Sequence, residues 1–253
     1  MNRKTLFAIA SAMLVGAAGA VTTTNTVCRI VLETTTEDTL ISIPLVDCTN
    51  GEISGALATI NPTNLVMTTG LPDGAALLYN DAGVWKSWVK SGTAWSAVNT
   101  VIGDTNAVAA VRDTFERGEA VRLYISGAST SNPYKVYLFG QYNKGDVTKL
   151  YGSGTAGAYT LVGNAQPKDI TLGTLPISAT AGDKIAVPAS TGTKLKEYIY
   201  QSGWKSIEFA PDANDVLGYN LTDATSVTIP AGRAFWYVTK TAETKNVTWA
   251  AMP

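Results

Sequence analysis

Apolar and polar residues alternate over many short stretches of this chain, which is the pattern of half-buried β-strands. Turn sequences such as Pro72-Asp73-Gly74 separate the stretches, because glycine and asparagine tolerate the positive φ that tight turns require. Only residues 107–115 have a helical pattern, with Asp104 or Thr105 as the N-cap. The predicted strands are residues 40–45, 75–79, 85–90, 120–125, 134–139, 184–187, 194–200, 234–239 and 246–249. Many short strands and one short helix near 105–115 predict an all-β fold.

The second half of the chain repeats the order of features of the first half. The clearest match shifts the chain by 114 residues, so that Arg117-Gly118-Glu119-Ala120-Val121 meets Ala231-Gly232-Arg233-Ala234-Phe235. The shift is 120 at the start of the match and about 108 to 110 in its middle, so the loops differ in length. We therefore predict two tandem β-sandwich or open-barrel-like repeats, residues 21–144 and 145–253.

The repeat also predicts which side of one strand faces solvent. Phe235 and Tyr237 match Val121 and Leu123, so this parity is apolar in both copies. Trp236 matches an arginine, which is a poor core residue. Strand alternation therefore predicts that Trp236 points outward.

The first twenty residues have the features of a secretory signal peptide. Asn2-Arg3-Lys4 is a short positive start, an apolar run follows from 6 to 15, and Ala18-Gly19-Ala20 supplies a cleavage site. The apolar run is shorter than a bilayer requires, and no second run of membrane length follows. We expect an exported protein, extracellular, at the cell surface or periplasmic.

The mature chain is nearly neutral. The formal charge of −1 becomes −3 when Arg3 and Lys4 are removed. Such a surface gives no electrostatic reason to bind nucleic acid or anionic lipid. Both are excluded as expected partners.

The two cysteines, Cys28 and Cys48, predict a disulfide, because the chain is exported. The segments flanking residues 33–38 have the pattern of a hairpin that would bring them opposite each other. Two thiolates alone cannot complete a zinc shell, and the chain has no histidine.

Several structural motifs resemble those of a family of exported bacterial β-rich repeat proteins. They include Leu71-Pro72-Asp73-Gly74, Ser202-Gly203-Trp204 and the run from Ile229 to Trp236. Similar proteins have a strand like N-L-I-x-N-P and a later P-G-x-G-F-F-V, although here Ala165 and Arg233-Ala234 depart from that pattern. The family has no known activity, so the resemblance implies secretion, repetition and β structure, and assigns no site.

The sequence holds no catalytic motif. Without histidine, Ser-His and Cys-His nucleophile pairs cannot form. A pair of carboxylates could act on a glycoside, and the candidates are Glu116, Glu119, Glu197 and Glu208. Ordinary strand and turn roles explain these acids better, so we expect no enzyme and no cofactor.

Two weaker ligand sites are candidates. Asp212, Asn214 and Asp215 form an oxygen-rich loop that suits Ca²⁺, with Asp73 and Asp81 a looser pair. Among the six tryptophans, Trp95 and Trp204 match each other and are expected in the core. Trp236, and more weakly Tyr198, are the candidate exposed contacts.

Three functions remain open from the sequence. The first is a secreted or cell-surface structural protein that self-associates or contacts another surface protein through β edges. The second is an extracellular module that binds carbohydrate or protein through its aromatic residues. The third is a glycoside-acting enzyme.

Overall fold

A computed structural model describes residues 25–46, 59–81, 84–98, 100–101, 104–108, 114–143, 145–152, 154–188, 195–211 and 217–250. Within these ranges the protein is built from antiparallel sheets, so the predicted all-β fold is confirmed. Each of the nine predicted strands overlaps an observed one. The predicted signal peptide, Cys48 and the loop with Asp212, Asn214 and Asp215 lie outside the described residues.

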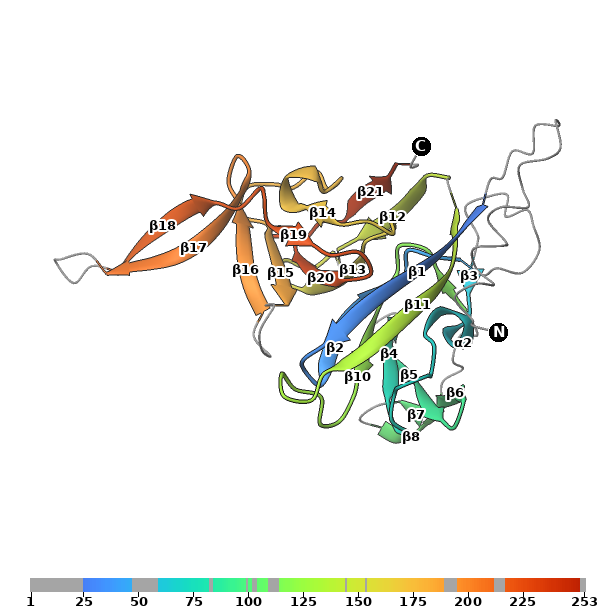
Figure 1. Cartoon of the computed structure of the whole chain (residues 1–253). Helices are drawn as coiled ribbons and strands as arrows, with labels where there is room; N and C mark the ends of the chain where they lie inside the picture. The colour runs from blue at the N-terminus through green and yellow to red at the C-terminus, as the bar shows by residue number, and fades with distance from the viewer. Residues whose placement is uncertain are drawn as a thin grey trace, which may run out of the picture.

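The first group of strands forms what we call the N-terminal β unit (Figure 1). A five-stranded sheet has the order β2-β10-β4-β5-β6, and β1 pairs with β11 over the full length of both strands. The elements are β1 (Asn25–Thr34), β2 (Asp38–Ser42), β3 (Thr59–Ile60), α2 (Pro62–Leu65), β4 (Ala76–Asp81), β5 (Val84–Ser91), β6 (Ala94–Val98), β7 (Thr100–Val101), β8 (Asp104–Val108), β9 (Phe115–Glu116), β10 (Ala120–Tyr124) and β11 (Tyr134–Asn143).

The second group forms the C-terminal β unit, with the sheet order β13-β20-β15-β16-β17-β18. Its first and last strands, β12 and β21, also pair with each other. The elements are β12 (Val147–Tyr151), β13 (Tyr159–Gly163), β14 (Ile170–Thr171), the 3₁₀ turn η1 (Leu172–Thr174), β15 (Lys184–Pro188), β16 (Leu195–Tyr200), β17 (Trp204–Pro211), β18 (Leu217–Asp223), β19 (Thr228–Ile229), β20 (Ala234–Val238) and β21 (Lys245–Trp249).

The two units have the same connectivity over most of their strands. In the N-terminal unit the sheet runs from the second strand of the unit, β2, to its next-to-last strand, β10, and then to β4, β5 and β6. In the C-terminal unit the equivalent order is β13, β20, β15, β16 and β17. Short pairs, β3 with β9 and β14 with β19, also correspond. The main difference is β18, which adds a sixth strand to the C-terminal sheet alone.

Each unit has its own hydrophobic core between its main sheet and its pair of terminal strands. In the N-terminal unit, the Trp88 ring lies edge-on to Phe115, with centroids 4.7 Å apart, and stacks against Tyr79. Leu138 of β11 closes this core from the other side. This two-layer arrangement is sandwich-like. Trp95 and Trp204 are both buried, which confirms their predicted packing role.

A buried hydrogen-bonded pair distinguishes the core of the C-terminal unit. The hydroxyl of Tyr237 donates to Asp183, with an oxygen–oxygen distance of 2.6 Å, and the backbone N–H groups of Thr180 and Lys240 also donate to this carboxylate. Burial, and then the hydrogen bond to Asp183, raise the pKa of Tyr237.

The N-terminal unit fills the two corresponding positions with apolar residues. Ala75 and Leu123, both buried, stand where the C-terminal unit has Asp183 and Tyr237. A lone aspartate at this depth would be costly. The buried aspartate therefore occurs only in the unit that also has the tyrosine bonded to it.

The predicted helix over 107–115 is wrong where the structure describes it. Asp104–Val108 is strand β8, which pairs with β7, and Phe115–Glu116 is strand β9, which pairs with β3. The apolar spacing of so short a segment does not separate a helix from a strand. Here residues 104–108 form a strand because they pair with β7, and residues 115–116 because they pair with β3.

The predicted hairpin around residues 33–38 is also wrong. β1 pairs with β11, whereas β2 pairs with β10 in a different sheet. The residues between β1 and β2 therefore carry the chain from one layer to the other. Cys28 lies in β1 opposite Gly140 and is half-buried, and the predicted disulfide with Cys48 stays a prediction.

The two units contact each other reciprocally through glycine turns. The turn before β10 places Gly118 against Val147 and Lys149 of the C-terminal unit. The turn before β20 places Gly232 against Ile30 and Leu32 of the N-terminal unit. Both glycines have positive φ, +86° and +77°, so glycine is required there for conformation as well as for space.

Backbone contact continues at the edges of the two main sheets. The backbone N–H of Ser42, at the end of β2, donates to the carbonyl of Gly232 at 2.8 Å. On the other side, a Cβ added to Gly163 at the end of β13 would lie 2.0 Å from the carbonyl oxygen of Glu119. The buried hydroxyl of Tyr151 donates to the Gly118 carbonyl at 2.7 Å, which ties the turn in place.

Within the described residues, no helix has the length and apolar character of a membrane span.

We predict that Gly163→Ala lowers the free energy of unfolding by about 3 kcal/mol, because its Cβ would overlap backbone that cannot turn aside. Gly154→Ala is the matched control. No atom lies within 4 Å of a Cβ at that position, so it carries only the cost of positive φ, about 1 kcal/mol. Urea unfolding followed by tryptophan fluorescence measures both variants. Equal losses would contradict a tight contact between the units.

Candidate functional site

The face of the six-stranded sheet that points away from its core is the candidate site, and we call it the outer face. Strand register sets its composition, because directly paired residues lie on the same side of a sheet. One row across the sheet is Tyr159, Val238, Lys184, Ile199, Lys205 and Asp223. The next row contains Leu161, Trp236, Ala186 and Glu197.

An aromatic pair lies at one end of this face. Trp236 is half-buried, as its predicted outward direction requires, between Phe235 and Tyr237, which are fully buried. Its ring lies edge-on to Tyr159, with centroids 6.2 Å apart and an interplanar angle of 84°. Tyr159 is 52% exposed.

A short polar chain continues from the aromatic pair. The Tyr159 hydroxyl donates to Oε1 of Glu197 at 2.9 Å, and Nζ of Lys184 lies 3.4 Å from Oε2 of the same carboxylate. The hydrogen bond to Glu197 is the main cause of a raised pKa for Tyr159, with burial second. Three strands contribute to this arrangement, so sequence reasoning missed Tyr159 and Lys184 as its members.

The corresponding face of the N-terminal unit has different chemistry at equivalent positions. Arg122 occupies the position of Trp236, and Asp38 that of Tyr159. Nε of Arg122 lies 3.1 and 3.2 Å from the two Asp38 oxygens, and its guanidinium lies over the Trp85 ring at 5.1 Å. An ion pair therefore replaces the aromatic pair.

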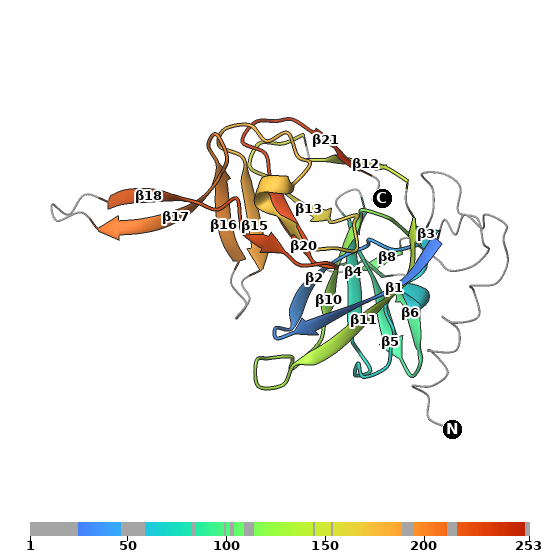
Figure 2. The ribbon, with the colours of Figure 1, turned by 45° about the horizontal axis from the view of Figure 1, so that its top comes forward.

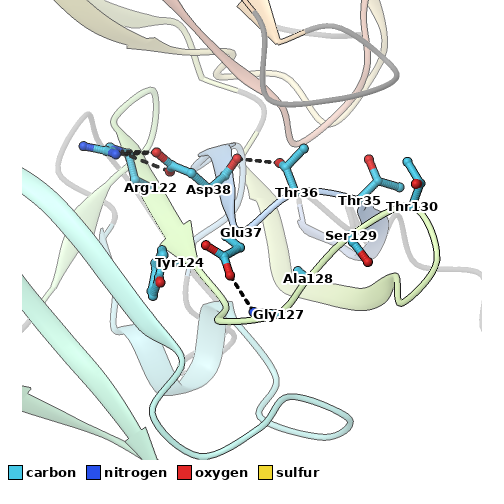
Figure 3. A pocket seen from close by; sticks show the side chains of 10 residues that line it. All are labelled: Thr35, Thr36, Glu37, Asp38, Arg122, Tyr124, Gly127, Ala128, Ser129 and Thr130. Carbon is cyan, nitrogen blue, oxygen red and sulfur yellow. Dashed lines mark hydrogen bonds and ion pairs between the residues drawn. The ribbon is translucent and has the colours of Figure 1, made fainter.

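A surface hollow lies beside this ion pair (Figure 3). Its volume is about 650 Å³, and it is bordered by residues 35–38, Arg122, Tyr124 and residues 127–130. Figure 3 shows two further hydrogen bonds among its lining residues: Thr36 donates to the Asp38 carbonyl at 2.8 Å, and the N–H of Gly127 donates to Glu37 at 2.7 Å. The bond between Gly127 and Glu37 joins the crossover after β1 to the loop after β10, which is a structural role.

The other predicted contact residue is not on the outer face. Tyr198 is 5% exposed and belongs to the core of the C-terminal unit. Its expected exposure is therefore wrong. Its paired residue Ser206 is buried on the same side, which shows that this parity of β16 and β17 faces inward.

The acids considered for glycoside chemistry have structural partners. Glu116 pairs with Lys149 across the two units, and its backbone N–H donates to Glu119 at 2.8 Å. Glu197 belongs to the outer face, and the side chain of Glu208 lies outside the described residues. Nor do the described residues contain a group of three or more aspartate, glutamate, cysteine or histidine side chains that could hold a metal ion.

Asp73, a weak calcium candidate, also has a structural partner. Its Oδ1 accepts from Nζ of Lys90 at 2.6 Å and from the N–H of Gly92 at 3.0 Å. The Lys90 side chain is buried, so Asp73 supplies its counter-charge.

No family model, curated protein or solved structure matches this chain.

We predict a pH-dependent effect of Asp73→Asn. The hydrogen bond from Lys90, followed by that from Gly92, lowers the pKa of Asp73 below its ordinary value of 3.8. The stabilisation is therefore complete above that value and is lost as the pH falls through the lower pKa of the folded state.

Thermal midpoints of wild type and Asp73→Asn should consequently differ at neutral pH and converge as the pH falls below the lowered pKa of Asp73. Thermal scans followed by circular dichroism test this. A gap that stays constant with pH would show that the charge of Asp73 is not its cause.

Proposed function

We propose that the protein is an exported, non-catalytic β-rich protein that acts by contact, assembling with further copies of itself or with another surface protein. The observation that carries this proposal is the presence of exposed apolar side chains on the outer face. Tyr159, Leu195 and Leu221 are 52%, 44% and 41% exposed, and Trp236 lies beside the first of them. Exposed apolar side chains gathered on one sheet face favour an interaction surface.

The absence of histidine from the sequence, and the structural partners of Glu116, Glu119 and Glu197, support contact rather than turnover. In this proposal calcium, if bound at Asp212, Asn214 and Asp215, has a structural role. Carbohydrate or a second protein is the expected partner, and nucleic acid is not.

The proposal includes a tandem duplication. The shared strand order of the two units and their reciprocal glycine turns support two copies of one repeat. Such a duplication fits the resemblance to exported bacterial repeat proteins. The signal peptide, the Cys28–Cys48 disulfide and a location outside the cell or at its surface belong to the same proposal.

Assembly is tested by light scattering and negative-stain microscopy of residues 21–253, kept oxidised, with and without calcium. We expect a mass above that of the monomer that rises with protein concentration, because burying the apolar side chains of the outer face is favourable. A monomer at every concentration would overturn self-assembly. If the mass rises with concentration only when calcium is present, calcium takes part in the assembly.

The aromatic pair favours a second candidate, binding of a neutral saccharide. Trp236 and Tyr159 offer apolar ring surface beside the Glu197 carboxylate, which can accept hydrogen bonds from hydroxyl groups. Aromatic rings and a nearby polar group are usual components of a small-molecule site.

This candidate predicts saturable quenching or enhancement of tryptophan fluorescence by cello- or chito-oligosaccharides. Trp236→Ala should weaken binding at least about tenfold, which corresponds to roughly 1.4 kcal/mol. Arg122→Ala, the equivalent position of the N-terminal unit, is the control and should leave the affinity unchanged. Unchanged binding by a folded Trp236→Ala variant would exclude the aromatic pair as the saccharide site.

A further inference from the structure

The hairpin of β17 and β18 projects from the body of the protein. Figures 1 and 2 both show the two strands extending beyond the end of the C-terminal sheet. Its base is fixed, because Trp204 and Ala224 are buried and the Ala224 N–H donates to the Trp204 carbonyl at 2.9 Å. From there, β17 and β18 pair from Lys205 with Asp223 to Pro211 with Leu217.

Apolar pairs alternate with polar or small pairs along this hairpin. The pairs Ile207–Leu221, Phe209–Tyr219 and Pro211–Leu217 are apolar, and the pairs between them are Ser206–Thr222, Glu208–Asn220 and Ala210–Gly218. Directly paired positions share one face. The apolar positions of the two strands, which we call the apolar stripe, are therefore all of one parity, and the side chains described among them, Ile207 and Leu221, share one face.

This stripe continues the outer face of the sheet. Lys205 pairs with Ile199, which is in the same row as Tyr159. Ile207, two positions further along β17, points to the same side. Ile207 is half-buried and Leu221 is 41% exposed, so solvent reaches this stripe.

The outer edge of β18 is open. In the sheet order β18 has β17 as a neighbour on one side and, within the described residues, no strand on the other. Edge strands are normally protected by lysine, proline or a bulge. The sequence of β18, Leu-Gly-Tyr-Asn-Leu-Thr-Asp, contains neither lysine nor proline, and its pairing with β17 has no register shift.

A second β18 fits this edge. When two copies align antiparallel around Asn220, all seven residues of β18 overlap, with Leu221 opposite Tyr219 and Leu217 opposite Asp223. This alignment keeps odd positions opposite odd positions, so the two apolar stripes lie on the same side of the joined sheet. The contact is isologous, as in most homodimers.

We propose that two copies of the protein pair through β18, joining their six-stranded sheets into one continuous sheet. This inference rests on the proposed function of assembly and assigns it a particular edge. The near-neutral charge of the chain opposes such pairing little.

Charge complementation at Asn220 tests the pairing, because Asn220 is exposed and faces its own counterpart across the two-fold axis. Asn220→Lys and Asn220→Glu each place like charges opposite each other, which disfavours pairing. We expect the mass of each variant, measured by light scattering, to fall about twofold from that of wild type. An equimolar mixture of the two variants should recover the wild-type mass, since a lysine of one variant then faces a glutamate of the other.

Ser96→Lys and Ser96→Glu are the matched controls. Ser96 is exposed at the centre of β6, the edge strand of the five-stranded sheet, and these variants should keep the wild-type mass. Circular dichroism confirms that every variant is folded.

The outcomes separate the two proposals. Wild-type assembly that survives both Asn220 variants, or that is lost in the Ser96 variants, would overturn pairing through β18 and leave assembly standing. A wild-type monomer at all concentrations would overturn both. Monomeric Asn220 variants whose mixture does not reassociate would also overturn the antiparallel alignment around Asn220.

Discussion

Contact between the two units depends on glycine where the backbone of one reaches the other. A Cβ at Gly163 would lie 2.0 Å from the Glu119 carbonyl oxygen, and Gly118 and Gly232 combine positive φ with close neighbours from the opposite unit. These contacts bring the ends of the edge strands β2 and β13 against the other unit. The open edge at β18 is therefore left at the periphery, on the projecting hairpin (Figure 2).

At equivalent positions, the two units differ in both residues of a contacting pair and not in one residue alone. Asp38 and Arg122 form an ion pair where Tyr159 and Trp236 form an aromatic pair. Paired residues on one sheet face contact each other, so a charge introduced alone would lose its partner and a bulky ring alone would lose its packing. The shared strand order thus supports two different surfaces, and the aromatic pair belongs to that of the C-terminal unit.

The described residues offer a broad sheet face and a surface hollow. In the hollow beside Asp38, the Gly127 N–H donates to Glu37 and the Thr36 hydroxyl donates to the Asp38 carbonyl. The outer face, by contrast, runs from Tyr159 across the sheet to Leu221 on the hairpin with several apolar side chains in solvent. A broad face with an open edge suits contact with another β-rich surface, and the aromatic end of the same face suits a smaller ligand.

Local alternation of apolar and polar residues predicted nine of the strands, because strand pattern has a period of two within the segment itself, but it did not predict the strands β17 and β18. Comparison of the two halves was enough to direct Trp236 outward. Which strands pair with each other was not predictable in the same way. The segment 104–108 is a strand because β7 pairs with it, β1 and β2 lie in separate sheets because β11 and β10 pair with them, and Tyr198 is buried because its register with Ser206 turns it inward. Pairing between distant strands also gathered Tyr159, Lys184 and Glu197. The sequence by itself therefore determined the all-β class, nine of the strands and the outward face of Trp236, whereas only the tertiary structure decided the remaining strands and which faces met, since that choice depends on register between residues far apart in the chain.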